Sequence, residues 1–143
     1  MLTAIFPARH DQLKAISHFV LDAIKDAPFD NRQRYAIDLA VDEACSNIID
    51  HAYEGANTGE IRILLDLNDQ GVRITFQDDG APFDPDCVAE PDLTSPLETR
   101  CERGLGVFLI REVMDKAAYD FSLPGINQLI FVKYFNPNQK VAC

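Results

Sequence analysis

Two polar residues on one helix-like segment are the first candidates for chemistry. Glu43 and Asn47 are four residues apart and His51 follows after four more, so all three share one stripe of a helix. An Asn carbonyl oxygen is a ligand suited to Mg²⁺, which takes few protein ligands when it also holds substrate phosphates. A Glu one turn earlier could deprotonate a nucleophile beside that metal. The alternative is a solvated polar stripe, and for His51 we favour a local structural role.

A second candidate is the acidic turn at Asp78-Asp79-Gly80, which follows a strand-like segment. An Asp at a strand end can accept a hydrogen bond from an exocyclic amine such as that of adenine. Gly80 permits a positive φ or the close approach of a ligand. Because Asp-Gly pairs are also common in ordinary turns, this motif alone is weak.

A third candidate is the glycine turn Gly104-Leu105-Gly106, which opens directly into a helix-like segment. Free N–H groups and the macrodipole at a helix N-terminus attract phosphate, and Arg103 could add a charged contact. The turn is neither a Walker P-loop nor a strand-linked dinucleotide fingerprint. Each of the three motifs is weak evidence alone. The three together in this order are far less likely to occur by chance than any one of them.

The periodicity of the apolar residues predicts the elements that must position these motifs. We expect strands at 2–7, 60–67, 72–78, 117–122 and 127–135. We expect helices at 10–26, 31–53 and 104–116, the second of them capped by Asp30 or Asn31. The buried faces of the first two helices would carry Leu13, Ile16, Val20 and Ile24, and Leu39, Ala40, Ala44 and Ile48.

The order of these elements predicts an α+β two-layer sandwich, with helices on one face of a mixed, mostly antiparallel sheet. The segment 79–103 holds four of the eight prolines and should be an irregular loop. A loop of that length inside a compact domain is typically functional or disordered.

The composition is that of one acidic globular domain over residues 1–143. The chain is 47% hydrophobic and carries a net charge of -10, which disfavours direct binding to nucleic acid or to an anionic membrane surface. No run approaches the roughly 20 apolar residues that span a bilayer, so we expect a cytoplasmic location. The four cysteines lack C-x-x-C spacing, so we expect free thiols and no zinc site.

Taken together, the motifs resemble the GHKL superfamily (gyrase, the large heat-shock chaperone ATPases, histidine kinases and mismatch-repair ATPases). Within it, the chain resembles the small bacterial anti-sigma-factor serine/threonine kinases. The resemblance covers essentially the whole chain and rests on EACSNIIDHAY at 43–53, DDGAPFDP at 78–85 and RGLG at 103–106. It implies the Bergerat ATPase fold. The segment 125–129 (GINQL) matches the family's final hairpin only loosely, so the adenine contacts from the C-terminal strands are left open.

The resemblance implies a role for the residues of the first two motifs. Glu43 would be the catalytic base, and Asn47 would bind ATP through Mg²⁺. Asp78 would bind the adenine amino group, and Gly80 would allow close approach to the nucleotide.

The resemblance also implies roles for the segment that follows. Residues 86–103 would form the ATP lid, and Gly104, Leu105 and Gly106 would hold the phosphates. Arg103 would reach the terminal phosphate as part of the catalytic machinery.

The function implied by the resemblance is an ATP- and Mg²⁺-dependent serine/threonine protein kinase that acts as an anti-sigma factor. Such kinases phosphorylate a STAS-type anti-anti-sigma partner, sequester a sigma factor and often form homodimers. The alternative is a nucleotide-binding module of little or no activity that regulates a partner by sequestration. The presence of both Glu43 and Asn47 argues for activity. The lid at 86–103 contains five carboxylates and no glycine, which would weaken ATP retention when no partner orders it. A STAS partner in another signalling circuit is a further alternative.

Overall fold

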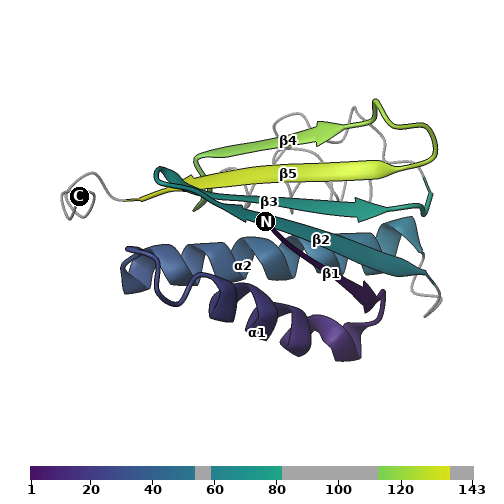
Figure 1. The fold of residues 1–143 in the computed structure, drawn as a ribbon. Helices are drawn as coiled ribbons and strands as arrows, with labels where there is room; N and C mark the ends of the chain where they lie inside the picture. Colours follow the sequence, from purple (N-terminus) through teal and green to yellow (C-terminus); the bar gives the residue numbers. More distant parts are fainter. Residues whose placement is uncertain (54–58, 82–112, 136–143) are drawn as a thin grey trace, which may run out of the picture.

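The computed structural model describes residues 1–53, 59–81 and 113–135. Two helices and five strands are present in these ranges (Figure 1). In chain order they are β1 (Leu2–Pro7), α1 (Leu13–Ala23), α2 (Asn31–Asn47), β2 (Glu60–Leu67), β3 (Gly71–Asp78), β4 (Lys116–Asp120) and β5 (Asn127–Tyr134). A 3-10 turn (His10–Gln12) precedes α1, and a five-residue π-turn (Ile48–Ala52) follows α2.

The strands form one open sheet in the order β1-β2-β3-β5-β4. All four pairings between these strands are antiparallel. Both helices lie on the same side of the sheet (Figure 1). The predicted α+β two-layer sandwich is therefore confirmed, although the described strands form an antiparallel sheet throughout rather than a mixed one.

The core lies between this sheet and the two helices. Burial alternates along β2 and, from Val72 onwards, along β3, so that every second side chain faces the helices, as expected of a sheet covered on one side. Phe76 and Phe131 pack at the centre with ring centroids 5.2 Å apart. The predicted helix faces are buried except for Leu13 and Leu39, which are half-buried. The fully buried strand residues are Ile61, Ile63, Leu65, Val72, Ile74, Phe76 and Phe131.

The start of α2 is fixed by side chains that satisfy the backbone groups a helix end leaves open. Asp30 accepts the Gln33 N–H at 2.7 Å, and the Gln33 amide oxygen accepts the Asp30 N–H at 3.1 Å, which completes a capping box. The Arg34 guanidinium donates to four carbonyl oxygens of the α1–α2 connection, those of Ile24, Lys25, Ala27 and Phe29. The prediction of Asp30 as a cap is confirmed, and these bonds set where the later residues of α2 lie.

Several predicted boundaries differ from the structure. Helix α1 begins at Leu13 and not at residue 10, because the backbone first makes a 3-10 turn. The α-helical hydrogen bonding of α2 ends at Asn47, six residues before the predicted end. Lys116 was expected to end a helix but opens β4, where it pairs with Val132. The reason is local, since the Asp115 N–H already donates to the Val132 carbonyl at 3.0 Å.

Two further sequence expectations concern membranes and cysteines. In the described ranges, no helix is long and apolar enough to cross a membrane. Cys45 is a free, fully buried thiol on α2. Burial raises its pKa, so the thiol is protonated and packs as a small apolar group. Cys87, Cys101 and Cys143 lie outside the described residues.

Candidate functional site

The first two motifs meet in one small cavity on the helix side of the sheet. Asn47 at the end of α2, Asp78 at the end of β3 and Asn127 at the start of β5 all line it, together with Ile48, Ala52, Ala81 and Tyr119. The cavity volume is about 30 Å³. Asp78 and Asn127 are opposite each other because β3 and β5 pair in that register. Two of the residues singled out in the sequence, Asn47 and Asp78, are thus brought together.

Asp78 is held in one orientation at the edge of this cavity. Its side chain is buried, with 7% of the residue surface exposed. Its Oδ1 atom accepts the Gly80 N–H at 3.0 Å and the Asn127 Nδ2–H at 2.9 Å. A buried carboxylate oriented by donors in this way can present its acceptor capacity to a ligand amine.

Gly80 is required by the packing of the protein's own backbone. A Cβ atom at this position would lie 2.7 Å from the carbonyl carbon of Ala52, well inside van der Waals contact. The Ala81 N–H donates to the Ala52 carbonyl at 2.7 Å, which ties the turn to the end of the helical segment. The positive φ suggested from the sequence is absent, since only Gly59 and Gly125 have one among the described glycines. The group that comes close to Gly80 in the structure is the Ala52 carbonyl of the protein itself.

The π-turn after Asn47 explains how the helix reaches the turn at Gly80. The Tyr53 N–H donates to the Ile48 carbonyl at 3.2 Å, a spacing of five residues. This extra residue per turn changes the direction in which the last carbonyl groups point, and π-turns are frequent at functional sites. The His10 ring Nε2 lies 2.7 Å from Asp50 Oδ1, so the outer side of the π-turn is bonded to the segment before α1.

The Asn47 side chain carries a polar group that the described protein leaves unmatched. Its Nδ2 atom is buried and has no hydrogen-bond partner. The two ends of a carboxamide have nearly the same shape and exchange places by rotation about χ2, so the same position can present Oδ1 instead. A buried, unpaired amide is costly without a ligand. The arrangement therefore fits an amide that completes its bonding with a bound cation or nucleotide.

Glu43 lies one helical turn before Asn47 on α2 and is half-buried. Desolvation raises the pKa of this carboxyl above its ordinary value, and the negative charge of the neighbouring Asp42 raises it further. A carboxylate with a raised pKa is a stronger base, which suits proton transfer from a hydroxyl group. Glu43 does not line the cavity of Asn47 and Asp78.

Tyr53 holds the same turn from its other side, a role that the sequence reasoning missed. Its hydroxyl lies 2.7 Å from Asp79 Oδ1 and 3.0 Å from the Glu60 carbonyl oxygen, and it accepts the Asp79 N–H at 3.1 Å. Burial, together with the hydrogen bond to Asp79, raises the pKa of Tyr53 to about 12. The ring covers Gly59, whose φ of 90° and lack of Cβ leave room for it. The sequence feature that could have revealed this role is Tyr53 itself, the last residue of the motif EACSNIIDHAY at 43–53.

Asn127 is the second residue that the sequence reasoning did not assign. It lies in the segment that only loosely matches the family's final hairpin. Its Nδ2 atom lies within hydrogen-bonding distance of Asp78 Oδ1, the Gly80 carbonyl and the Ala81 carbonyl. The register of β3 with β5 would have identified it, because Asn127 is the Cα partner of Asp78.

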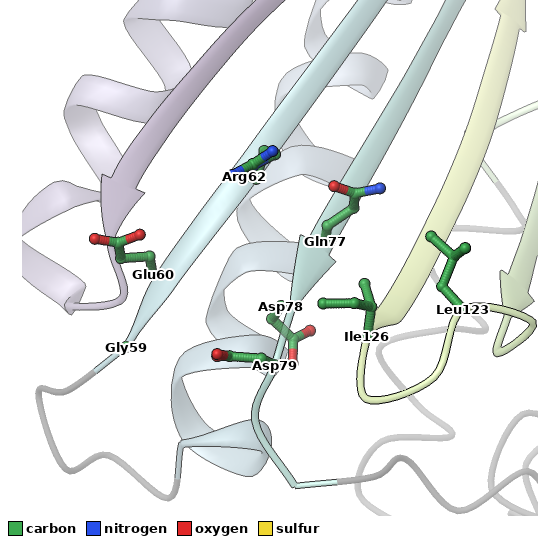
Figure 2. Close-up of a pocket in the computed structure, with 8 residues that line it drawn as sticks. All are labelled: Gly59, Glu60, Arg62, Gln77, Asp78, Asp79, Leu123 and Ile126. Carbon is green, nitrogen blue, oxygen red and sulfur yellow. The ribbon is translucent and has the colours of Figure 1, made fainter.

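A larger open hollow of about 580 Å³ lies beside this site (Figure 2). Figure 2 shows the side chains of Arg62 on β2 and Gln77 on β3, with the turn that carries Leu123 and Ile126 at one side. Asp78 borders both hollows, but neither Glu43 nor Asn47 lines the larger one. We place the candidate site in the smaller cavity because the motif residues converge there. The residues lining the larger hollow are Gly59, Glu60, Arg62, Gln77, Asp78, Asp79, Leu123 and Ile126.

The third motif cannot be placed relative to this cavity. Arg103, Gly104, Leu105 and Gly106 lie outside the described residues, as does the expected lid at 86–103. The side chain of His51 also lies outside what the structure describes.

Comparison with known proteins identifies the family. Residues 6–133 match the model of the histidine kinase-like ATPase domain. The serine-protein kinase RsbW of Bacillus cereus (strain AH820) is 37% identical over 95 residues, which are 59% of this chain and 59% of that protein. RsbW of Bacillus anthracis gives the same values. The chain thus spans less than two thirds of the length of these curated relatives.

Solved structures agree on the fold. The RsbU and RsbW domains of Rv1364c from Mycobacterium tuberculosis superpose with a TM-score of 0.65 at 14% identity, over 96% of this chain and 34% of that one. The catalytic domain of the histidine kinase ThkA superposes with a TM-score of 0.57 at 16% identity, over 97% of this chain and 99% of that one. The motif geometry, the family match and the shared fold agree, and the chain belongs to the histidine kinase-like ATPase domain family.

Proposed function

We propose that this chain is an ATP-dependent serine/threonine protein kinase whose nucleotide site includes the cavity between α2, β3 and β5. The observation that carries the proposal is the convergence of Asn47 and Asp78 on that cavity, one with an unpaired buried amide and the other with an oriented carboxylate. The curated relatives, which are named serine-protein kinases, support transfer to a protein hydroxyl.

In this proposal each described residue has one task. Asp78 accepts a hydrogen bond from the exocyclic amine of adenine. Asn47 would hold Mg²⁺, which when bound neutralises charge on the phosphates. Glu43 takes the proton from the serine or threonine hydroxyl that attacks the terminal phosphorus, and ADP leaves as the bond between its β-phosphate oxygen and that phosphorus breaks. Little covalent chemistry is required of the protein in phosphoryl transfer, because positioning and electrostatics supply most of the rate enhancement.

The remaining parts of the machinery are proposed from the motifs alone. Gly104, Leu105 and Gly106 would bind the phosphates, and Arg103 would reach the terminal one. Residues 86–103 would close over the nucleotide as a lid of a single domain spanning residues 1–143. On the family resemblance, we further propose a cytoplasmic kinase that phosphorylates a STAS-type anti-anti-sigma protein and sequesters a sigma factor as a homodimer.

The experiment that tests the nucleotide site is calorimetric titration with ATP, in the presence and absence of Mg²⁺. We expect Mg²⁺-dependent binding by the natural chain, and loss of the Mg²⁺ dependence in Asn47→Ala. The matched control is Asn68→Ala, since Asn68 caps the β2–β3 turn at the opposite end of β3. Unchanged Mg²⁺-dependent ATP affinity in Asn47→Ala would refute its assignment as the metal ligand.

A second candidate function is sequestration of a partner without phosphoryl transfer. It is favoured by the sequence of residues 86–103, whose five carboxylates would repel the ATP phosphates. Incubation with radiolabelled ATP and a candidate STAS protein separates the two functions. Label on a serine or threonine of the partner supports the kinase, whereas a stable complex without label, despite ATP binding, supports sequestration.

A further inference from the structure

A third hollow, of about 410 Å³, lies between the two helices. Helices α1 and α2 pack against each other on one side of the sheet (Figure 1), and both contribute side chains to this α1–α2 hollow. None of its lining residues borders either hollow described above. The residues that line it are Leu13, Lys14 and Ser17 of α1, and Tyr35, Asp38, Leu39 and Asp42 of α2.

The α1–α2 hollow lies in line with the proposed catalytic residues of α2. Leu39 comes one helical turn before Glu43, and Asn47 one turn after it, so the three side chains follow one stripe of the helix. Asn47 lines the nucleotide cavity and Leu39 lines the α1–α2 hollow, whereas Glu43 lines neither. A hydroxyl that gives its proton to Glu43 therefore has the nucleotide on one side and this hollow on the other.

A protein substrate has to cover more of the surface than its one hydroxyl group. Specific protein interfaces bury about 800 Å² on each partner. A substrate whose serine or threonine reaches Glu43 must therefore also contact the surface around that residue. On the side of α2 away from the nucleotide cavity, this surface is the α1–α2 hollow.

The hollow offers apolar contacts to such a partner. Leu13 and Leu39 are only half-buried. Tyr35 is 71% exposed, more than any other aromatic residue in the described part of the chain. Aromatic residues beside an apolar depression are typical anchors of protein interfaces. The fold does not require this ring to be exposed, and a partner would bury it.

The α2 side of the hollow is acidic. Asp38 accepts a hydrogen bond from the Ser17 hydroxyl, and Asp42 is exposed. Neither carboxylate forms an ion pair with any residue that the structure describes. Among the lining residues Lys14 is the one cation, and it belongs to α1. A basic side chain of a partner is therefore complementary to the α2 side, whereas an acidic one is repelled.

We propose that the α1–α2 hollow is the docking surface for the protein substrate. A basic side chain of the substrate lies against Asp38 and Asp42, and an apolar one lies against Tyr35. The inference rests on the proposed kinase function and adds the chemistry by which the same site recognises its protein partner. The hollow does not contain the reacting atoms, so it sets the affinity for the substrate and not the rate of transfer within the complex.

The test is the transfer assay with radiolabelled ATP and a STAS protein that accepts the label, over a range of STAS concentrations at saturating ATP and Mg²⁺. Tyr35→Ala removes the exposed ring. Asp38→Asn removes one charge and keeps an oxygen for the Ser17 hydroxyl. The matched controls are Tyr134→Ala, at a partly exposed tyrosine on β5, and Asp69→Asn, at an exposed aspartate between β2 and β3. Thermal melting and calorimetric titration with ATP check the fold and the nucleotide site of each variant.

We expect Tyr35→Ala to raise the KM for the STAS protein about tenfold or more, as for the loss of an interface anchor. Asp38→Asn should raise this KM roughly two- to fivefold, as for the loss of an exposed ion pair. The maximal rate and the ATP affinity should stay at their natural values in both variants. The KM of the natural chain should rise with NaCl concentration, and that of Asp38→Asn should rise less. Both controls should keep the natural KM.

Three results would overturn the inference. An unchanged KM in both Tyr35→Ala and Asp38→Asn, in a chain that labels the STAS protein, removes the docking surface and leaves the proposed function standing. A changed oligomeric state of Tyr35→Ala, measured by light scattering, would mean that a second copy of the chain covers the hollow instead. Failure of the natural chain to label any STAS protein removes the proposed function and the inference together.

Discussion

At the scale of single residues, the proposed base can be separated from its neighbours by its titration. Glu43→Gln should retain ATP binding and lose transfer by about 10²–10⁴-fold, the usual contribution of a general base. Because desolvation and Asp42 raise the pKa of Glu43, the transfer rate should rise with pH through a value above that of an ordinary Glu. The measurement is the transfer rate against pH under saturating ATP.

Asp42→Asn is the matched variant for that profile. Asp42 is exposed and is the second cause of the raised pKa of Glu43. Its neutralisation should move the acid limb of the profile to lower pH while the rate at neutral pH is unchanged. A limb that stays in place in Asp42→Asn, or full activity in Glu43→Gln, contradicts the assignment of the base.

The raised pKa of Glu43 also predicts that ionisation of this carboxyl lowers the stability of the fold, although it raises the transfer rate. The pKa of Glu43 is higher in the folded chain, so the protonated form contributes stability that is present below the unfolded pKa. That stability is lost as pH rises through the folded pKa. At neutral pH the ionised Glu43 therefore costs stability, and Glu43→Gln should melt at the same or a higher temperature. The difference should shrink as the pH falls below about 4, near the pKa of an unfolded Glu.

Tyr53 offers a second residue-scale prediction. Tyr53→Phe keeps the ring over Gly59 and removes only the hydroxyl that bonds Asp79. We expect a loss of about 0.5–1.5 kcal/mol in the free energy of unfolding, typical of a hydrogen-bonding group, measured by urea denaturation. Weaker ATP binding should accompany it, since Asp79 adjoins Asp78. Tyr35→Phe is the control, because Tyr35 is 71% exposed and should cost almost nothing.

At the scale of elements, the contact between the α2 π-turn and the β3 turn forms the site. Gly80→Ala would force the new Cβ against the Ala52 carbonyl, an overpacking that typically costs about 1–3 kcal/mol. Because the displaced turn carries Asp78, we expect ATP affinity to fall as well. Calorimetry and urea denaturation measure the two effects.

Arg34→Met is the contrasting variant for Gly80→Ala. It removes the four bonds to the carbonyls of the α1–α2 connection and should also lower stability. It lies far along α2 from the cavity, so ATP affinity per folded molecule should be preserved. Equal effects of both variants on ATP affinity would show that the site has no special dependence on the Gly80 contact.

The sequence predicted the elements better than it predicted the contacts between them. The strands predicted at 60–67 and 72–78 and the cap at Asp30 follow from local patterns, and they are confirmed. The π-turn left no periodic signal, because it lies at the end of the helical segment, where its extra residue shifts the phase of no later turn. Gly80 was recognised, but the partner that requires it, Ala52, is distant in sequence. The role of Asn127 could be recognised only from the register of β3 with β5, which no local sequence pattern supplies.

At the scale of the whole molecule, ligand binding should stabilise the fold in a way that depends on Asn47. A ligand that binds only the folded state adds about 2.7 kcal/mol at 100 times its dissociation constant. For a domain of this size that corresponds to a rise in melting temperature of roughly 5–10 °C. We expect this rise with ATP and Mg²⁺ together in the natural chain, and a much smaller one in Asn47→Ala.

The unpaired amide of Asn47 makes this last prediction specific. Without ligand the buried Nδ2 group is a cost to the folded state, so Asn47→Ala should melt no lower than the natural chain when both are free of nucleotide. With ATP and Mg²⁺ the order should reverse, because only the natural chain gains the ligand's contribution. Melting curves of both proteins, with and without each component, measure the effect. A lower melting temperature of free Asn47→Ala would instead mean that Asn47 serves the fold, and that its place in the cavity has a structural origin.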